Sequence, residues 1–107
     1  MWDTAAQGFA AMGSESRLQV LRVLIRAGQS GLTVSDIQDR TGIAPSTLAH
    51  HLKFLSGAGL VEQEKVGRMT VNRACYGVLQ DLAEFILDEC CADTANADTV
   101  IKAANDG

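Results

Sequence analysis

The sequence contains few aromatic residues, few cysteines and no long apolar run, and each shortage excludes a class of protein. Aromatic residues make up 5% of the 107 residues, so aliphatic side chains must fill the core. Three cysteines are an odd number and do not indicate a disulfide framework, so we expect free thiols in a reducing compartment. No apolar run reaches the length of about 18 residues that indicates a membrane-spanning helix.

Signals for export and for catalysis are also missing. The first four residues, Met1–Thr4, lack the basic and apolar stretches of a signal peptide, which indicates a cytoplasmic protein. The only two histidines are His50 and His51, and no pattern pairs them with a nucleophile. A glycine-rich loop that holds phosphate is absent as well, so we do not expect an enzyme, and we expect no required cofactor.

The acidic net charge of −4 is unevenly distributed along the chain. Residues 1–75 carry eight Lys or Arg against six Asp or Glu, a net charge of +2, whereas residues 76–107 carry one base and seven acids. This asymmetry favours a weakly basic part that contacts nucleic acid and an acidic part that is held away from phosphate. A random scatter of charges is the alternative.

The length of the chain is that of a single domain, small enough for dimerisation to help complete its core. We expect one folded domain at residues 1–92. Residues 93–107 are small, polar and acidic, which indicates a flexible tail with at most a short helix near Thr99–Ala104.

Local capping signals predict the first three helices. Apolar residues between positions 4 and 12 predict a short first helix. Ser14 then caps a second helix, which Gly28 closes. Thr33 and Asp36 have the spacing of a capping box, with an acid in place of the usual Glu or Gln, and predict a short third helix.

The fourth helix is expected at residues 45–57. Pro45 suits its first turn, where the missing N–H costs nothing, and Leu48, Leu52 and Leu55 form a narrow buried stripe along it. A short helix, a tight turn containing glycine and a second helix with a polar outer face together indicate a helix-turn-helix.

The rest of the domain completes a winged fold. Residues 60–66 and 68–73 predict two strands joined at Gly67 in a hairpin, and Val78–Cys91 predicts an apolar last helix. The expected fold is therefore mainly α with a small β-hairpin wing, in the order α-α-α-α-β-β-α. The last helix is too apolar to leave exposed, so we expect a homodimer.

The sequence resembles the ArsR/SmtB family of winged helix-turn-helix repressors over about residues 8 to 92. The motifs that carry the resemblance are Ile43–Leu55, with its His-His-Leu-Lys, then Ala58–Val61 and Val66–Arg68. The resemblance implies a homodimer joined through the first and last helices and a recognition helix in the major groove of a palindromic operator in double-stranded DNA. It also implies that the DNA is released when an inducer binds.

Two metal sites of that family have no counterpart in this sequence. Many metal-sensing members carry Cys-x-Cys in the first helix of the DNA-binding motif, but the comparable stretch here, Leu32–Asp36, has no cysteine. Zinc-sensing members use histidines and carboxylates on the last helix, and this last helix has no histidine. A zinc site of that type is therefore not expected.

The outer face of the fourth helix and the hairpin tip supply the expected DNA contacts. Hydroxyl and imidazole groups bond base edges or phosphates, and cationic side chains attract phosphate. The candidate DNA-binding residues are Ser46, Thr47, His50, His51, Lys53, Lys65 and Arg68. Capping of the helix start is the alternative role for Ser46 and Thr47, and packing beside the leucine stripe is the alternative for His51.

Cys90 and Cys91 are adjacent at the predicted end of the last helix. Neighbouring helical residues point about 100° apart, so the two sulfurs converge on one ion only if the helix end unwinds. Thiolates select soft ions, and within the family this pair resembles arsenite-responsive members, which implies As(III), Sb(III) or a trivalent organoarsenical as inducer. Redox or persulfide sensing and simple packing remain alternatives.

Cys75 is a possible third ligand. It precedes Cys90 by 15 residues, about 22 Å along a helix, which is too far to share an ion within one chain. In a dimer with antiparallel last helices, Cys75 of one subunit would approach the cysteine pair of its partner. The alternative is that Cys75 packs where the hairpin meets the last helix.

Overall fold

The computed structural model describes residues 2–94, so the predicted helix near Thr99–Ala104 and most of the predicted tail lie outside the described residues. The mainly helical winged helix-turn-helix that the sequence predicts is confirmed. Its elements are α1 (Trp2–Ala11), α2 (Glu15–Ala27), the 3-10 turn η1 (Gly28–Ser30), β1 (Leu32–Thr33), α3 (Val34–Thr41), α4 (Pro45–Gly57), β2 (Val61–Val66), β3 (Met69–Ala74) and α5 (Tyr76–Asp88). Within the described range, no helix has the length and apolar character needed to cross a membrane.

The predicted caps set the starts of α2 and α3. The hydroxyl oxygen of Ser14 accepts a hydrogen bond from the N–H of Arg17 at 3.4 Å. In the capping box of α3, the N–H of Asp36 donates to Thr33 Oγ1 at 3.2 Å, and the N–H of Thr33 donates to Asp36 Oδ2 at 3.1 Å. These bonds with Thr33 hold the pKa of the Asp36 carboxyl below its ordinary value.

The core lies where α2, α3 and α4 pack together. The leucine stripe of α4 is fully buried there, as predicted. Its buried apolar partners on α2 and α3 are Val20, Leu21, Leu24 and Ile37. The outer positions Leu18 and Ile25 of α2 remain 51% and 42% exposed. The core therefore uses one narrow face of each helix.

A third strand, which the sequence analysis missed, joins the predicted hairpin. The sheet is antiparallel in the order β1-β3-β2. The buried side chain of Asn72 ties all three strands together: its amide donates to Leu32 O at 3.2 Å, and its Oδ1 accepts from Gln63 Nε2 at 2.7 Å. This fixes the base of the wing to the helix-turn-helix.

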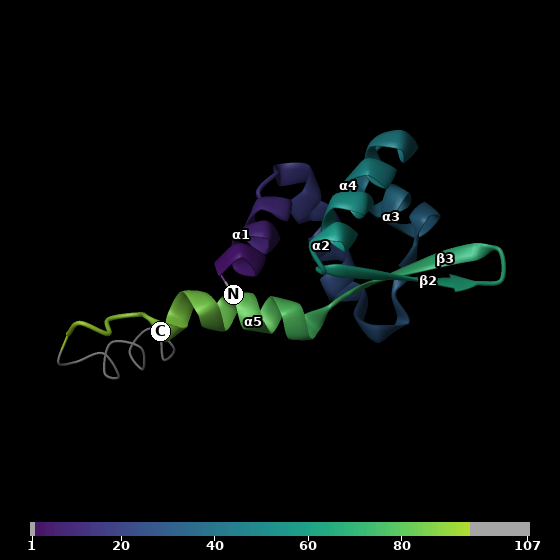
Figure 1. The fold of residues 1–107 in the computed structure, drawn as a ribbon. Helices are drawn as coiled ribbons and strands as arrows, with labels where there is room; N and C mark the ends of the chain where they lie inside the picture. The colour runs from purple at the N-terminus through teal and green to yellow at the C-terminus, as the bar shows by residue number, and fades with distance from the viewer. Residues whose placement is uncertain (1, 95–107) are drawn as a thin grey trace.

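The wing is a tight hairpin. Val66 pairs with Met69, which leaves Gly67 and Arg68 as a two-residue turn. Gly67 has a φ of 63° and Arg68 does not have a positive φ, as in a type II′ turn with glycine at its first central position. In Figure 1 this wing extends to one side of the helical body and α5 extends to the other, with α1 lying over α5.

The last helix begins and ends earlier in the sequence than predicted, because it starts at Tyr76. The sequence predicts a helix over Val78–Cys91, but α5 ends at Asp88, and Cys90 and Cys91 lie in the turns that follow. Asp88 and Glu89 place negative charge at the helix C-terminus, where the helix dipole is also negative. Cys91 then adopts a φ of 59°, which is incompatible with further α-helix.

Candidate functional site

The outer face of α4 presents four of the predicted DNA-binding residues. Ser46, Thr47, His50 and Lys53 are all exposed. The N-cap residue of α4 is Ala44, Pro45 follows it, and no side chain makes a capping hydrogen bond at this helix start. The capping role that was the alternative for Ser46 and Thr47 is therefore not seen. The two hydroxyls therefore face outward at the N-terminal end of the helix, the end that enters the groove in helix-turn-helix proteins.

His51 lies between the buried stripe and the exposed face. Its side chain is half-buried, and its Nδ1 atom is buried with no hydrogen-bond partner among the described residues. Burial lowers the pKa of this imidazole, and the charges of Arg17 and His50 lower it further. A neutral, half-buried imidazole fits the packing alternative better than a base contact.

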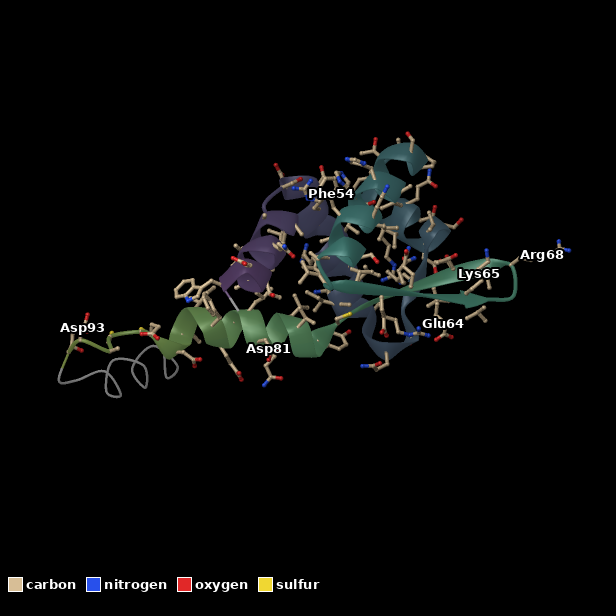
Figure 2. The ribbon with its side chains drawn as sticks, in the orientation of Figure 1. Phe54, Glu64, Lys65, Arg68, Asp81 and Asp93 are labelled. Carbon is tan, nitrogen blue, oxygen red and sulfur yellow. The ribbon has the colours of Figure 1, made fainter. Side chains whose placement is uncertain are left out.

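The wing carries the remaining two candidate residues. Lys65 and Arg68 are exposed, and Figure 2 shows both at the outer end of the hairpin, with Asp81 on α5 and Asp93 beyond it. The one ion pair among the described residues joins Arg73 to Glu64 at 3.3 Å and leaves the wing-tip cations available to phosphate. Among the described residues, the acids of α5 and of the turn after it are thus held away from the wing, as the charge asymmetry predicts.

Sequence reasoning missed two residues beside the exposed face of α4, Phe54 on the helix itself and Arg17 on α2. Phe54 of α4 is 48% exposed and lies against His50, with ring centroids 4.9 Å apart at 77°. The guanidinium of Arg17 lies 4.9 Å from the centre of the Phe54 ring. The i to i+4 spacing of His50 and Phe54 was the signal that placed them on one helix face.

The cysteine pair is brought together by the turn that ends α5. The sulfur atoms of Cys90 and Cys91 are 3.6 Å apart, and both residues are half-buried. The contact with Cys90 raises the pKa of the Cys91 thiol, so that thiol retains its proton at neutral pH. Sequence reasoning required the end of the helix to unwind before the two sulfurs could approach each other. In the structure, α5 ends before Cys90, and the two sulfurs are already in contact.

Cys75 lies apart from this pair. It is the N-cap residue of α5, at the opposite end of the helix, and its N–H donates to Leu60 O at 2.9 Å. Burial and the nearby Glu62 carboxylate raise the pKa of its thiol. Within residues 2–94 of a single chain, no group of three His, Cys, Asp or Glu side chains is arranged to hold a metal ion.

Known proteins with similar sequences are transcriptional regulators. A family model described as a helix-turn-helix domain matches residues 12–64. The HTH-type transcriptional regulator YbzH of Bacillus subtilis is 31% identical over 93 residues, which cover 76% of this chain and 93% of YbzH. These similarities are to DNA-binding regulators and not to enzymes.

Solved structures give the same result for the fold. An ArsR-like transcriptional regulator from Rhodococcus sp. RHA1 superimposes with a TM-score of 0.74 at 30% identity, covering 96% of this chain and 93% of that one. The homodimeric winged helix-turn-helix domain of Mb0332 from Mycobacterium bovis, described as a possible ArsR-family regulator, has a TM-score of 0.66 at 28% identity, with 82% of each chain covered.

Proposed function

This chain belongs to the ArsR family of winged helix-turn-helix transcriptional regulators, and from that premise we propose that it is a homodimeric cytoplasmic repressor that leaves a palindromic operator when a trivalent arsenical or antimonial binds Cys90 and Cys91. The observation that carries the inducer class is the 3.6 Å separation of the two sulfurs. Trivalent arsenic binds sulfur in a pyramidal arrangement, which places two bound sulfurs next to each other, so two sulfurs that are already in contact fit a soft centre of this kind with little rearrangement.

The chemistry of the pair also favours an arsenical. When As(OH)₃ binds, each thiol proton leaves with one hydroxyl group as water, and two As–S bonds replace two As–O bonds. Arsenic stays trivalent, so the step needs no oxidant. The raised pKa of the Cys91 thiol lowers its thiolate fraction and so slows the attack on oxidants that redox sensing requires. The exchange with arsenite is proton-neutral overall, because each thiol proton ends in a water molecule.

An exposed apolar surface supports the dimer. Trp2, Ile86 and Leu87 are 73%, 59% and 53% exposed, and Trp2 packs edge-to-face on Phe85 with ring centroids 4.8 Å apart. An open pocket of about 650 Å³ lies between α1 and α5 beside them. Exposed apolar surface of this kind is typical of an interface, and the similarity to the homodimeric Mb0332 domain supports a second copy as the partner.

The position of the cysteines links the inducer to this interface. Cys90 and Cys91 directly follow α5, and α5 packs on α1. Binding of arsenic at the turn constrains the last residues of α5, and any tilt of that helix changes the geometry of the dimer. Two recognition helices must lie about one DNA turn apart to occupy both half-sites, so a tilted interface lowers operator affinity.

The test is DNA binding with and without trivalent arsenic. A duplex selected from a random-sequence pool by the untreated protein serves as operator, and fluorescence anisotropy measures its release by arsenite and by phenylarsine oxide. We expect release from the wild type and none from the Cys90→Ser/Cys91→Ser variant, which keeps the side-chain size. Ala92→Ser, an exposed neighbour of the pair, is the matched control and should respond like the wild type. A double variant that still releases DNA at the same arsenic concentration contradicts the proposal.

Hydrogen peroxide and a persulfide donor separate the redox alternative in the same assay. If either oxidant releases the DNA in a way that dithiothreitol reverses, while arsenite has no effect, the pair is a redox sensor. If neither arsenicals nor oxidants act, the protein is a regulator of this family without a sensing role at these cysteines.

Sedimentation at micromolar concentration tests the dimer. We expect a dimer for the wild type and a monomer for Ile86→Glu, which places a charge on the proposed interface. Leu18→Glu, at a comparably exposed apolar position on α2, is the control and should remain dimeric. A wild-type monomer that binds DNA as a monomer contradicts this part of the proposal.

A further inference from the structure

The side chain of Arg17 connects three helices. From the first turn of α2 it reaches the C-terminus of α1, where its Nε donates to Ala11 O at 2.6 Å and its Nη2 donates to Ala10 O at 3.3 Å. The carbonyls at the end of a helix lack partners within the helix and carry partial negative charge, so a guanidinium is well suited to bind them. Arg17 therefore holds the end of α1.

The same guanidinium also holds α4. Its Cζ lies 4.9 Å from the centre of the Phe54 ring, a cation–π contact. Phe54 in turn contacts the ring of His50 edge-to-face. A continuous row of contacts thus runs from the end of α1 through Arg17 and Phe54 to an exposed imidazole on the face of α4 that is expected to contact DNA.

This row adds a restraint on α4 that lies outside its buried leucine stripe. The buried leucines of α4 form a narrow stripe, which fixes how deeply the helix sits in the core. Phe54 lies outside the stripe and is exposed, so the contacts from Phe54 through Arg17 to α1 act to one side of the stripe and oppose rotation of α4 about its own axis.

We propose that Arg17 is a positioning residue that sets the orientation of α4 relative to α1, and so the spacing at which the two recognition helices of the dimer meet their half-sites, without itself contacting DNA. The inference rests on the dimeric DNA-binding function proposed above, because α1 belongs to the proposed interface. If α4 rotates, its exposed residues lose their alignment with the groove in both half-sites at once.

The first test measures affinity, salt dependence and spacing with three variants. Arg17→Gln removes the guanidinium, which makes both the cation–π contact and the bonds to α1, Phe54→Leu removes the ring, and the double variant removes both side chains. We expect each single variant to bind the selected duplex between about threefold and tenfold more weakly, which corresponds to the loss of one cation–π contact. The double variant should bind the duplex no more weakly than the weaker-binding of the two single variants, because both substitutions break the same row of contacts.

Two further readouts separate positioning from direct contact. The slope of log affinity against log salt should not change in Arg17→Gln, because no phosphate contact is lost. Arg17→Gln should also discriminate less well than the wild type against duplexes whose half-sites are moved apart or together by one base pair. Arg22→Gln, an exposed arginine on the next turn of α2, is the matched control and should behave as wild type in both measurements.

A spectroscopic signature reports on the contact in the protein without DNA. The charge of Arg17 contributes to the lowered pKa of His51. An NMR titration should therefore show a higher pKa for His51 in Arg17→Gln than in the wild type. Arg17→Lys retains the charge and should restore part of both the pKa lowering and the operator affinity.

The outcomes distinguish this inference from the proposed function. A salt slope that falls by about one unit in Arg17→Gln shows a phosphate contact and overturns the inference. Unchanged affinity and spacing preference together with reduced stability show a purely structural role and also overturn it. If Arg17→Gln does not fold, Phe54→Leu decides by the same measurements. A wild type that binds the duplex as a monomer refutes the proposed function, whereas a dimeric wild type with unaffected variants refutes only the role of Arg17.

Discussion

Leu82 of α5 packs directly against the backbone of Gly8 in α1. A Cβ atom placed on Gly8 would stand 2.8 Å from Cδ1 and 3.2 Å from Cδ2 of Leu82, closer than carbon atoms pack without one of them moving. Leu82 is itself buried, so a side chain at Gly8 would have to push it out of its packed position toward the pocket between α1 and α5. The absence of a side chain at Gly8 therefore lets α1 and α5 approach closely beside the proposed dimer interface.

We expect Gly8→Val to destabilise the protein by about 1–3 kcal/mol, the usual cost of forcing extra carbon atoms into a packed site. The free energy of unfolding from a urea titration measures this. Ala6→Val places the same branched side chain at an exposed position of α1 and should cost only a few tenths of a kcal/mol. Equal stability of the two variants would show that Leu82 accommodates the new side chain and that the close approach is unimportant.

Lys53 and Arg68 should contribute electrostatic contacts to DNA. Both are exposed, one on the outer face of α4 and the other at the turn of the wing. We expect Lys53→Ala and Arg68→Ala each to weaken binding to all duplexes and to lower the slope of log affinity against log salt by about one unit.

The control for these charge deletions is Arg22→Ala, which removes an exposed cation from α2 and should leave the slope unchanged. If affinity at fixed salt is unchanged in both Lys53→Ala and Arg68→Ala, the DNA lies on another face of the protein.

Much of the fold could be predicted because its signals are local. The Ser14 cap, the Thr33–Asp36 capping box and Pro45 at the start of α4 each act within one helical turn, and all three set helix starts in the structure. The leucine stripe of α4 was equally local, because its spacing alone defines a face. These features identify the helix-turn-helix without any knowledge of distant contacts.

The remainder depends on contacts between segments that are distant in the sequence. The two residues of β1 become a strand only because β3 lies beside them, with Leu32 opposite Asn72. The row from Arg17 to Phe54 likewise requires α2 and α4 to be packed already. The end of α5 was predicted too late because apolar periodicity continues weakly to Cys91, while the acidic residues and the turn after Asp88 end the helix.

His51 should make stability depend on pH. Burial, followed by the charges of Arg17 and His50, lowers its pKa in the folded protein, so the unfolded chain binds a proton more readily. The stabilising effect of the neutral imidazole is therefore fully present above the ordinary histidine pKa of about 6.5 and is lost as the pH falls below it. We expect the free energy of unfolding to decrease between about pH 7 and pH 5, and His51→Gln to flatten this dependence.

The comparison for His51 is Asp36→Asn. The ordinary pKa of an Asp carboxyl, 3.8, is far below that of histidine, and the pKa of Asp36 is lowered from that value. Its stabilising effect is therefore present above pH 3.8 and is lost only in more acidic solution. Asp36→Asn should therefore leave the slope between about pH 7 and pH 5 unchanged. A slope that persists in His51→Gln would assign the dependence to another group.

The last prediction concerns Cys75, which lies at the far end of α5 from the cysteine pair. The 13 residues of α5 separate them by about 20 Å, so an ion could join them only between the two subunits of an antiparallel dimer. Cys75 is half-buried, its backbone is anchored to Leu60, and burial raises the pKa of its thiol. These features favour packing over ligation, so we expect Cys75→Ser to release DNA in response to arsenite and to a monomethylated trivalent arsenical as the wild type does.

A site with only two sulfurs matches the two exchangeable positions of the methylated compound, which should therefore act at lower concentration than arsenite. Loss of the arsenite response alone, with the methylated response retained, would contradict this prediction and show that Cys75 of the partner subunit completes a three-sulfur site.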